Sequence, residues 1–245
     1  EKNRLIAANM KELQALYDSL DRDLVEARKL QQTLVRDRFR DFGAATASLM
    51  IRSSGHVGGD LVGAFQIDDR RVAVSSVGVS GHGVASAMMT ARLAGYLSGS
   101  SPDQNLAFQQ LPDGRREVRR PSEIARAFNR LMLEDIQVEQ YFTMAYAELD
   151  LPTGRVVLAQ AGHPHPMVLR AGGRLERVGT GGLPVGLIPD AGYEDSSLTL
   201  APGDRLFLMS DGLTECPGPD GFDLGEEGLA RMLQRLSALD SPALF

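Results

Sequence analysis

The chain has 245 residues and a formal net charge of −6, with 32 Asp and Glu residues against 26 Lys and Arg residues. This length suits one domain with an appendage, and the acidic balance argues against nucleic acid as the main partner. The single cysteine, Cys216, excludes an internal disulfide and a cysteine zinc site within one chain.

Residues 1–42 contain no glycine and no proline, and they carry a heptad pattern. Spacings of four and three join the positions of an apolar seam, which are Ile6, Met10, Leu13, Tyr17, Leu20, Leu24, Ala27, Gln31 and Leu34. Eight of these nine side chains are apolar or aromatic, which predicts a coiled coil and favours a parallel homodimer. A helix that packs on its own domain would show a wider apolar stripe, and this remains the alternative.

We therefore assign residues 1–42 to a coiled-coil linker and dimerisation helix. Leu13, Leu20 and Leu24 are its candidate regulatory residues, because they lie in the seam. Gln31 interrupts the apolar seam, where it would set the register of pairing at some cost in stability.

From Gly43 onward, short apolar or alternating segments are separated by turn signals. Helices are predicted at 84–97, 121–135 and 225–238. Strands are predicted at 45–52, 61–67, 71–79, 142–149, 155–161, 166–170, 174–178, 196–200 and 205–210. Strands, two helices and then more strands indicate an α+β fold with largely antiparallel sheets, in a domain that covers residues 43–245.

Three segments of this domain carry residue types that suit metal or anion binding. Gly58-Gly59-Asp60 opens a strand, where glycines allow close backbone approach and the carboxylate is a hard oxygen donor. Residues 77–83, Val-Gly-Val-Ser-Gly-His-Gly, join a strand to a helix, where backbone groups can face an anion or a metal shell. Asp211 follows an apolar strand and precedes a glycine, an arrangement that can hold a metal at a sheet edge. Each segment by itself also fits a simple turn.

Two other segments favour structural roles. Residues 161–166 read Ala-Gly-His-Pro-His-Pro, and the prolines favour a rigid turn over a zinc site because no third His or Cys lies nearby in the sequence. A basic run favours a solvated loop edge over a phosphate-binding patch; it consists of Arg115, Arg116, Arg119 and Arg120.

In order and spacing, these motifs resemble the PPM-type metal-dependent Ser/Thr protein phosphatases, in particular their bacterial SpoIIE and RsbU branch. The resemblance rests on residues 58–60, 77–83, 161–163 and 210–215, and extends to 181–187 and 30–34. It implies a sandwich of two packed antiparallel sheets flanked by helices. It also implies two Mn²⁺ or Mg²⁺ ions that activate a bridging water for attack on phosphoserine or phosphothreonine.

The resemblance also implies roles for individual residues. Asp60 would be a catalytic metal ligand, partly through waters, and Asp211 would bind one metal directly. The backbone carbonyl of Val79 would face the other metal. His82 and Gly83 would support the strand-to-helix junction without binding metal.

Two departures from the family pattern matter. The family has a metal-bridging aspartate where this chain has Gly78, so we expect weakened metal binding and impaired activity. The family's later Asp-Asp-x-Thr motif, with a final metal-ligating aspartate, does not occur before Phe245. The domain is therefore expected to lack its C-terminal end here.

The function that the resemblance implies is a regulated phosphoprotein phosphatase acting on a phosphorylated anti-sigma-factor antagonist. The alternative is a pseudophosphatase that serves as a protein-binding signalling module, which Gly78 favours. Because Asp60 and residues 211–215 are retained, a single substitution in an otherwise active enzyme explains the pattern more economically.

The surroundings of the chain are also open to prediction. It begins at Glu1 inside the helical pattern, without a visible signal peptide. No apolar stretch approaches the ~20 residues that span a bilayer. We therefore expect part of a longer cytoplasmic protein, with a sensory or receiver domain upstream in the same polypeptide.

Overall fold

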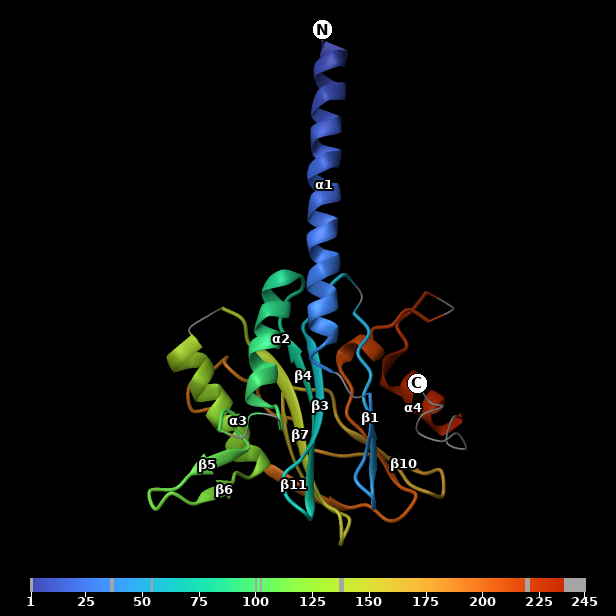
Figure 1. The fold of residues 1–245 in the computed structure, drawn as a ribbon. Coiled ribbons are helices and arrows are strands. Elements are labelled where there is room, and N and C mark those ends of the chain that lie inside the picture. Colours follow the sequence, from blue (N-terminus) through green and yellow to red (C-terminus); the bar gives the residue numbers. More distant parts are fainter. Residues whose placement is uncertain are drawn as a thin grey trace.

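The computed structural model of the chain describes residues 2–35, 38–53, 55–99, 101, 103–136, 139–218 and 221–235. Figure 1 shows a long N-terminal helix standing on a domain of sheets and shorter helices. Within these described ranges, no helix is both long enough and apolar enough to cross a membrane.

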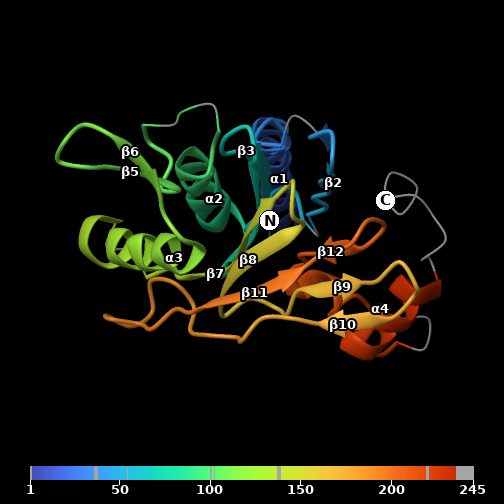
Figure 2. The same cartoon turned by 90° about the horizontal axis from the view of Figure 1, so that it is seen from below.

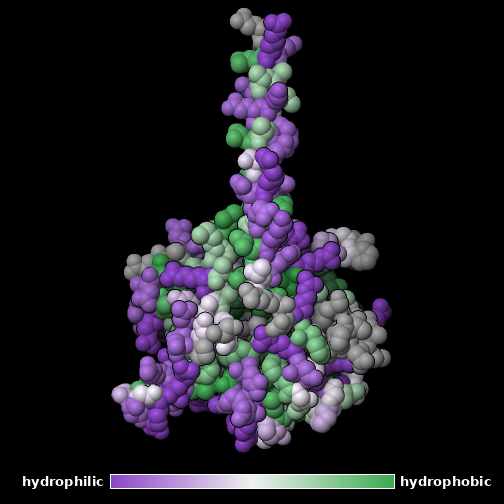
Figure 3. Space-filling model, in the orientation of Figure 1, coloured by the Kyte–Doolittle hydropathy of each residue, from purple (hydrophilic) through white to green (hydrophobic). Residues whose placement is uncertain are grey.

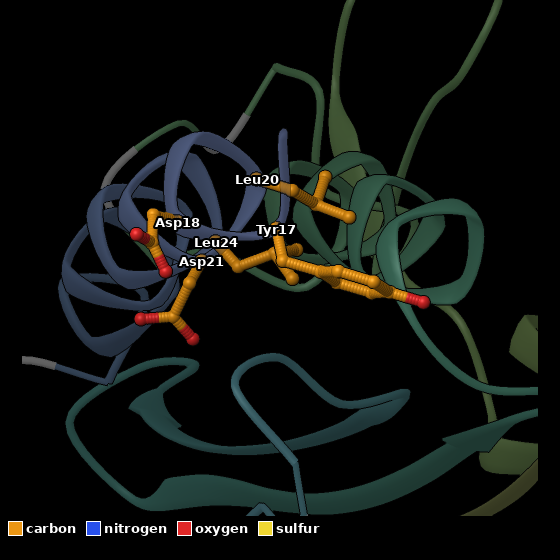
Figure 4. Close-up of a pocket in the computed structure, with 5 residues that line it drawn as sticks. All are labelled: Tyr17, Asp18, Leu20, Asp21 and Leu24. Atoms are coloured by element: carbon orange, nitrogen blue, oxygen red, sulfur yellow. The ribbon is translucent and has the colours of Figure 1, made fainter. Parts of the chain in front are cut away.

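The helix α1, Lys2–Gln32, has no buried residue along its 31 positions. Its upper part leaves the domain, and hydrophobic side chains show along it in Figure 3. The seam residues there are about half exposed or more: Ile6, Met10, Leu13, Tyr17 and Leu20. Tyr17, Leu20 and Leu24 line a shallow groove on α1, with Asp18 and Asp21 beside them (Figure 4).

The lower part of the same seam is partly covered by the chain's own domain. Leu24, Ala27, Gln31 and Leu34 are half-buried, and Leu34 packs against the main core. The helix ends at Gln32 rather than near residue 42, because Thr33 and Leu34 turn their amides back to the carbonyls of Leu30 and Gln31. One heptad seam therefore has an open upper half and an occupied lower half.

A five-stranded antiparallel sheet forms the centre of the domain, in the order β11-β8-β7-β4-β3. Its strands are β3 (Asp60–Gln66), β4 (Arg71–Val79), β7 (Phe142–Asp150), β8 (Arg155–Ala161) and β11 (Asp195–Thr199). Asp68 closes the β3–β4 hairpin, since one of its carboxylate oxygens accepts hydrogen bonds from the amides of Arg70 and Arg71, both at 2.9 Å. The strands predicted at 61–67 and 71–79 thus correspond to the two arms of this hairpin.

Two helices cover one face of this sheet. The helix α2 (Val84–Tyr96) packs on β3 and β4, and α3 (Pro121–Arg130) packs on β7 and β8. Proline at the first turn and Glu123, which accepts a hydrogen bond from the amide of Arg120 at 2.8 Å, begin α3. A π-helical turn, Leu131–Ile136, continues it. The largest apolar core lies between these helices and the sheet, and includes Leu93, Ile124, Phe128, Met132, Phe142 and Tyr146.

The other face of the large sheet packs on a second, three-stranded sheet in the order β10-β9-β12. Its strands are β9 (Met167–Leu169), β10 (Leu175–Arg177) and β12 (Arg205–Phe207). Val156 and Leu158 of β8 share a buried cluster with Leu206 of β12. The helix α4 (Gly225–Arg235) covers the small sheet through Leu229 and Leu233. Figure 2 shows the resulting helix–sheet–sheet–helix order, and the predicted sandwich is confirmed.

The differences from the predicted elements lie at the margins. The predicted strand 45–52 is reduced to β2 (Thr46–Ser48), which pairs with an unpredicted β1 (Phe39–Asp41). A second hairpin, β5 (Phe108–Gln110) with β6 (Arg116–Val118), also escaped prediction because its sequence is polar rather than alternating. Residues 236–238 of the last predicted helix lie outside the described residues.

Candidate metal and phosphate site

The register of the central sheet places Asp60, Gly78 and Thr143 in one row across three strands. Gly78 pairs with Asp60 on one side and with Thr143 on the other. A Cβ added at position 78 would lie 3.5 Å from Asp60 Oδ1 and 3.2 Å from Thr143 Oγ1. A side chain at position 78 would therefore emerge directly between the Asp60 carboxylate and the Thr143 hydroxyl.

The residues before Asp60 lie tightly against the end of β4. The amide of Val79 donates a hydrogen bond to the Gly59 carbonyl at 3.0 Å. A Cβ at position 59 would lie only 2.6 Å from the Val79 carbonyl oxygen. Position 59 therefore requires glycine, and this close approach fixes Asp60 beside the Val79 carbonyl.

Asp60 also meets the segment that follows β12. The Ser210 hydroxyl donates a hydrogen bond to Asp60 Oδ2 at 2.8 Å, across 150 positions of sequence. Burial is the main cause that raises the pKa of Asp60 above its usual value; the Ser210 hydrogen bond opposes the rise, and the charge of Asp211 adds to it. The fold thus brings together the two carboxylates that the motifs single out, with Asp211 exposed at the start of a short 3-10 helix, Asp211–Leu213.

The glycine-rich junction between β4 and α2 is closed mainly by serines. The Ser80 hydroxyl accepts a hydrogen bond from the Tyr141 amide at 3.0 Å, and Ser86 donates to the Gly83 carbonyl at 3.0 Å. Gly83 has a φ of 81°, in the left-handed region that favours glycine. His82 is exposed on this junction.

His163 lies buried behind position 78. Its Nδ1 is 2.9 Å from Thr143 Oγ1, and its Nε2 is 2.9 Å from Ser76 Oγ. Thr143 Oγ1 in turn lies 3.4 Å from the Gly78 carbonyl oxygen. Burial lowers the pKa of His163 to about 4, so the ring is neutral near pH 7 and acts as a hydrogen-bonding strut.

The sequence motifs include His163 and Ser210 but assign them no role, and they leave out Ser76 and Thr143. The two-residue period of a strand could have found Ser76, because it puts that residue on the same face as Gly78. The two histidines of residues 161–166 have separate partners, because His165 faces the carbonyl of Val178 at 3.3 Å.

The available donors are those that hard divalent cations prefer. Asp60 and Asp211 supply carboxylate oxygens and Val79 a carbonyl oxygen, as Mg²⁺ and Mn²⁺ sites require. Among the described residues, however, no group of three or more His, Cys, Asp or Glu side chains could hold a metal ion. The residue types present suit a hard cation, and Gly78 adds no further carboxylate to them.

The basic run near the β5–β6 hairpin is used within the fold. Arg119 donates to the carbonyls of Leu106 and Phe108 at 2.9 Å and 2.8 Å. The other three guanidinium groups pair with carboxylates: Arg115 with Asp113, Arg116 with Asp103, and Arg120 with Asp195. These contacts agree with a structural role for the run.

Comparison with known proteins gives a consistent family relationship. The sequence profile of the SpoIIE family, described as stage II sporulation protein E, matches residues 68–244. This range includes Gly78 and Asp211 but begins after Asp60.

The chain is 28% identical over 194 residues to the phosphoserine phosphatase RsbP of Bacillus subtilis, a match that covers 79% of this chain and 45% of RsbP. It is 23% identical over 211 residues to the phosphoserine phosphatase RsbU of the same organism, covering 86% of this chain and 58% of RsbU. The chain thus spans about half the length of these curated relatives.

Among solved structures, the SiaA-PP2C domain of Pseudomonas aeruginosa superposes with a TM-score of 0.70 at 19% identity, covering 94% of this chain and 87% of that domain. At this identity the likeness concerns the fold. It extends over the central sandwich and most of the described chain.

Proposed function

Because the chain belongs to the SpoIIE family of PP2C-type phosphatases, we propose that it is a regulated phosphoprotein phosphatase domain that hydrolyses phosphoserine or phosphothreonine. The resemblance found in the motifs is confirmed at the level of the family. One observation carries the proposal: Asp60, Asp211 and position 78, from three separate motifs, converge at one edge of the central sheet.

PP2C-type phosphatases depend on metal ions. In this chain Asp60 and Asp211 would hold Mn²⁺ or Mg²⁺, with the carbonyl of Val79 nearby. When bound, such ions lower the pKa of water and stabilise charge on the phosphoryl oxygens. The protein's own contribution is positioning: Ser210 orients the Asp60 carboxylate, and the tight contact of Gly59 with Val79 fixes its backbone.

Gly78 sets the expected activity of this chain. An aspartate there would add a carboxylate beside Asp60, and its Cβ contact of 3.2 Å with Thr143 Oγ1 requires a shift of only a few tenths of an ångström. Loss of supporting groups around a metal typically costs ~10–100-fold in affinity, and loss of a bridging ligand should cost more. We therefore expect weak metal binding and little turnover in the chain as it stands.

The test is the variant Gly78→Asp. We expect it to raise Mn²⁺ affinity by at least ~10-fold and to release phosphate from a phosphoserine protein and from a generic phosphoester. Gly172→Asp is the matched control, because position 172 has open space around it and lies in a turn away from the site.

The competing function is a pseudophosphatase that binds a partner without turnover. The observation that favours it is the lack, among the described residues, of a cluster with three metal-binding side chains. If Gly78→Asp stays inactive on both substrates while it still binds a phosphorylated partner, the binding-module function replaces the enzymatic one.

For the substrate, we propose a phosphorylated anti-sigma-factor antagonist. The support is the similarity to RsbP and RsbU, both named phosphoserine phosphatases. We also propose that the domain works in the cytoplasm. A sensory or receiver domain would precede it in the same polypeptide. Phosphate release from that antagonist should exceed release from an unrelated phosphoserine peptide when Gly78→Asp is assayed on both.

We propose that homodimer formation through α1 regulates the activity of the phosphatase domain. The open upper half of the seam exposes apolar side chains. Burying them against a second copy would stabilise the dimer by a free energy of roughly 25 cal/mol for each Å² of apolar surface removed from water. The lower half of the seam packs on the chain's own domain, so a change in how the two helices pair could be transmitted to that domain. We propose that residues 1–42 serve as this dimerisation linker and residues 43–245 as the phosphatase domain.

A further inference from the structure

We propose that Gln31 is a positioning residue, whose amide side chain fixes the Gly58-Gly59-Asp60 segment in place. Its Nε2 donates a hydrogen bond to the Gly58 carbonyl at 2.6 Å, and its Oε1 accepts one from the Gly58 amide at 3.0 Å. The two contacts pair a side-chain amide with both backbone groups of one residue, much as a neighbouring strand would do. The heptad pattern suggested a register role for Gln31, whereas here its amide faces the chain's own domain.

Gly58 is placed so that its position matters to Asp60. The next residue, Gly59, accepts hydrogen bonds from the Val79 amide at 3.0 Å and from the Thr90 hydroxyl of α2 at 2.9 Å. Consecutive Cα atoms are about 3.8 Å apart across a trans peptide, so a shift of Gly58 passes directly to Gly59 and Asp60. Three elements, α1, β4 and α2, therefore meet on two consecutive glycines that lead into Asp60.

A second contact between α1 and this segment is weaker. His56 Nε2 lies 2.9 Å from Asp21 Oδ1, but both side chains are well exposed. Exposed ion pairs contribute little and are screened by salt. The neutral, half-buried amide of Gln31 is therefore the main attachment of the segment to α1, and it does not depend on protonation or ionic strength.

The first test uses the chain as it stands and does not depend on metal or activity. Gln31→Met keeps the length of the side chain but removes both hydrogen bonds. We expect amide hydrogen exchange to accelerate roughly 5- to 10-fold at Gly58 and also at Val79, whose acceptor is Gly59. Ala73, at the other end of β4, should keep its protection. Faster exchange at Gly58 with unchanged protection at Val79 would overturn the proposal.

The second test rests on the proposed function and uses the Gly78→Asp chain. Adding Gln31→Met should weaken Mn²⁺ affinity, measured by calorimetry, by about 10-fold, while turnover at saturating Mn²⁺ recovers to near its starting value. Gln14→Met is the matched control, because Gln14 is exposed and bonds Asp18 on the same helix. A lower melting temperature with unchanged Mn²⁺ affinity would show a merely structural role. If Gly78→Asp itself neither binds Mn²⁺ nor turns over, the proposed function has failed, and the exchange result still decides the role of Gln31.

Discussion

His163 couples the pH dependence of stability to the interior of the sheet. Its folded-state pKa of about 4 lies below the ordinary value of 6.5 because the ring is buried. Between these values the unfolded chain binds a proton that the folded chain excludes, so the free energy of unfolding falls as pH drops from 6.5 towards 4. The contribution of His163 to stability is thus present above pH 6.5 and lost at lower pH.

We predict a loss of about 2 kcal/mol in unfolding free energy from this residue between pH 7 and pH 5. Urea unfolding at the two pH values measures it. His163→Gln keeps hydrogen-bonding capacity towards Thr143 but cannot titrate, so its curve should be flatter over this interval by that amount. An equally steep curve for His163→Gln would assign the pH dependence to other groups.

Ser210 supports the Asp60 carboxylate through a hydrogen bond that lowers its pKa. Ser210→Ala should raise that pKa further and leave the carboxylate less well oriented. In the Gly78→Asp chain we expect Mn²⁺ affinity to fall about 10-fold, measured by calorimetry. Ser197→Ala, on the exposed side of β11, is the control; equal affinities for the two variants would exclude a supporting role for Ser210.

The site illustrates what single residues in a sequence can and cannot predict. Asp60 and Asp211 could be proposed because a carboxylate next to glycine at a strand end is a local pattern. Thr143 and Ser210 could not, because their relation to Asp60 depends on strand register and on a contact across 150 positions. Local patterns identify residues that could bind a metal, whereas the side chains that contact those residues are determined by the tertiary structure.

At the level of elements, α1 makes a specific prediction about association. Leu13→Lys with Leu20→Lys places two charges in the open half of the seam, where both leucines are 54% exposed. We expect the chain to become monomeric by analytical ultracentrifugation, because burying lysine charges in the pairing seam is unfavourable. Leu24 is left unchanged because it is half-buried. Replacing it could destabilise the domain as well as prevent dimerisation, and the two effects could not be told apart.

The matched control places the same two charges on the opposite side of the helix, as Ala8→Lys with Ala15→Lys. This variant should associate like the unaltered chain. Dimers that persist in the Leu13→Lys, Leu20→Lys chain would contradict pairing through α1. If the Leu13→Lys, Leu20→Lys chain is monomeric but its turnover in the Gly78→Asp background is unaltered, dimerisation does not regulate activity.

Element boundaries were predictable where local chemistry marks them. The helix predicted over 121–135 does begin at Pro121, and Asp68 lies in the turn between the strands predicted at 61–67 and 71–79. The end of α1 was not predictable from the absence of glycine and proline. The chain leaves the helix there because backbone turns and the packing of Leu34 on the core replace further helical hydrogen bonds.

For the whole molecule, the described contacts predict that the domain folds without most of α1. No residue of α1 is buried, so deletion of residues 2–20 should shift the melting temperature by less than about 4 °C, equivalent to roughly 1 kcal/mol for a domain of this size. Differential scanning calorimetry measures the shift. A deletion that extends through Leu34 removes a side chain from the main core and should lower the melting temperature more; equal shifts for both deletions would contradict this division of α1.

The layer order of the whole domain could be predicted largely through the family resemblance. Composition and strand patterns alone indicate α+β with antiparallel sheets, but they do not say which strands share a sheet. The separation into a sheet of five strands and a sheet of three depends on which apolar faces meet, as Leu158 and Leu206 do. Such long-range pairing is not written in any local segment.

The length of α1 has a mechanical consequence. A helix of 31 residues is about 46 Å long, and its lower end is held at Gln31 and Leu34. Tilting such a rod by about 5° about that end moves its tip by about 4 Å, but moves atoms near the pivot by only a few tenths of an ångström. The helix is therefore a reducing lever. A displacement of several ångströms at the far end therefore corresponds to a displacement of only a few tenths of an ångström at Gly58. Displacements of that size are enough to make or break a hydrogen bond or a contact with a metal ion.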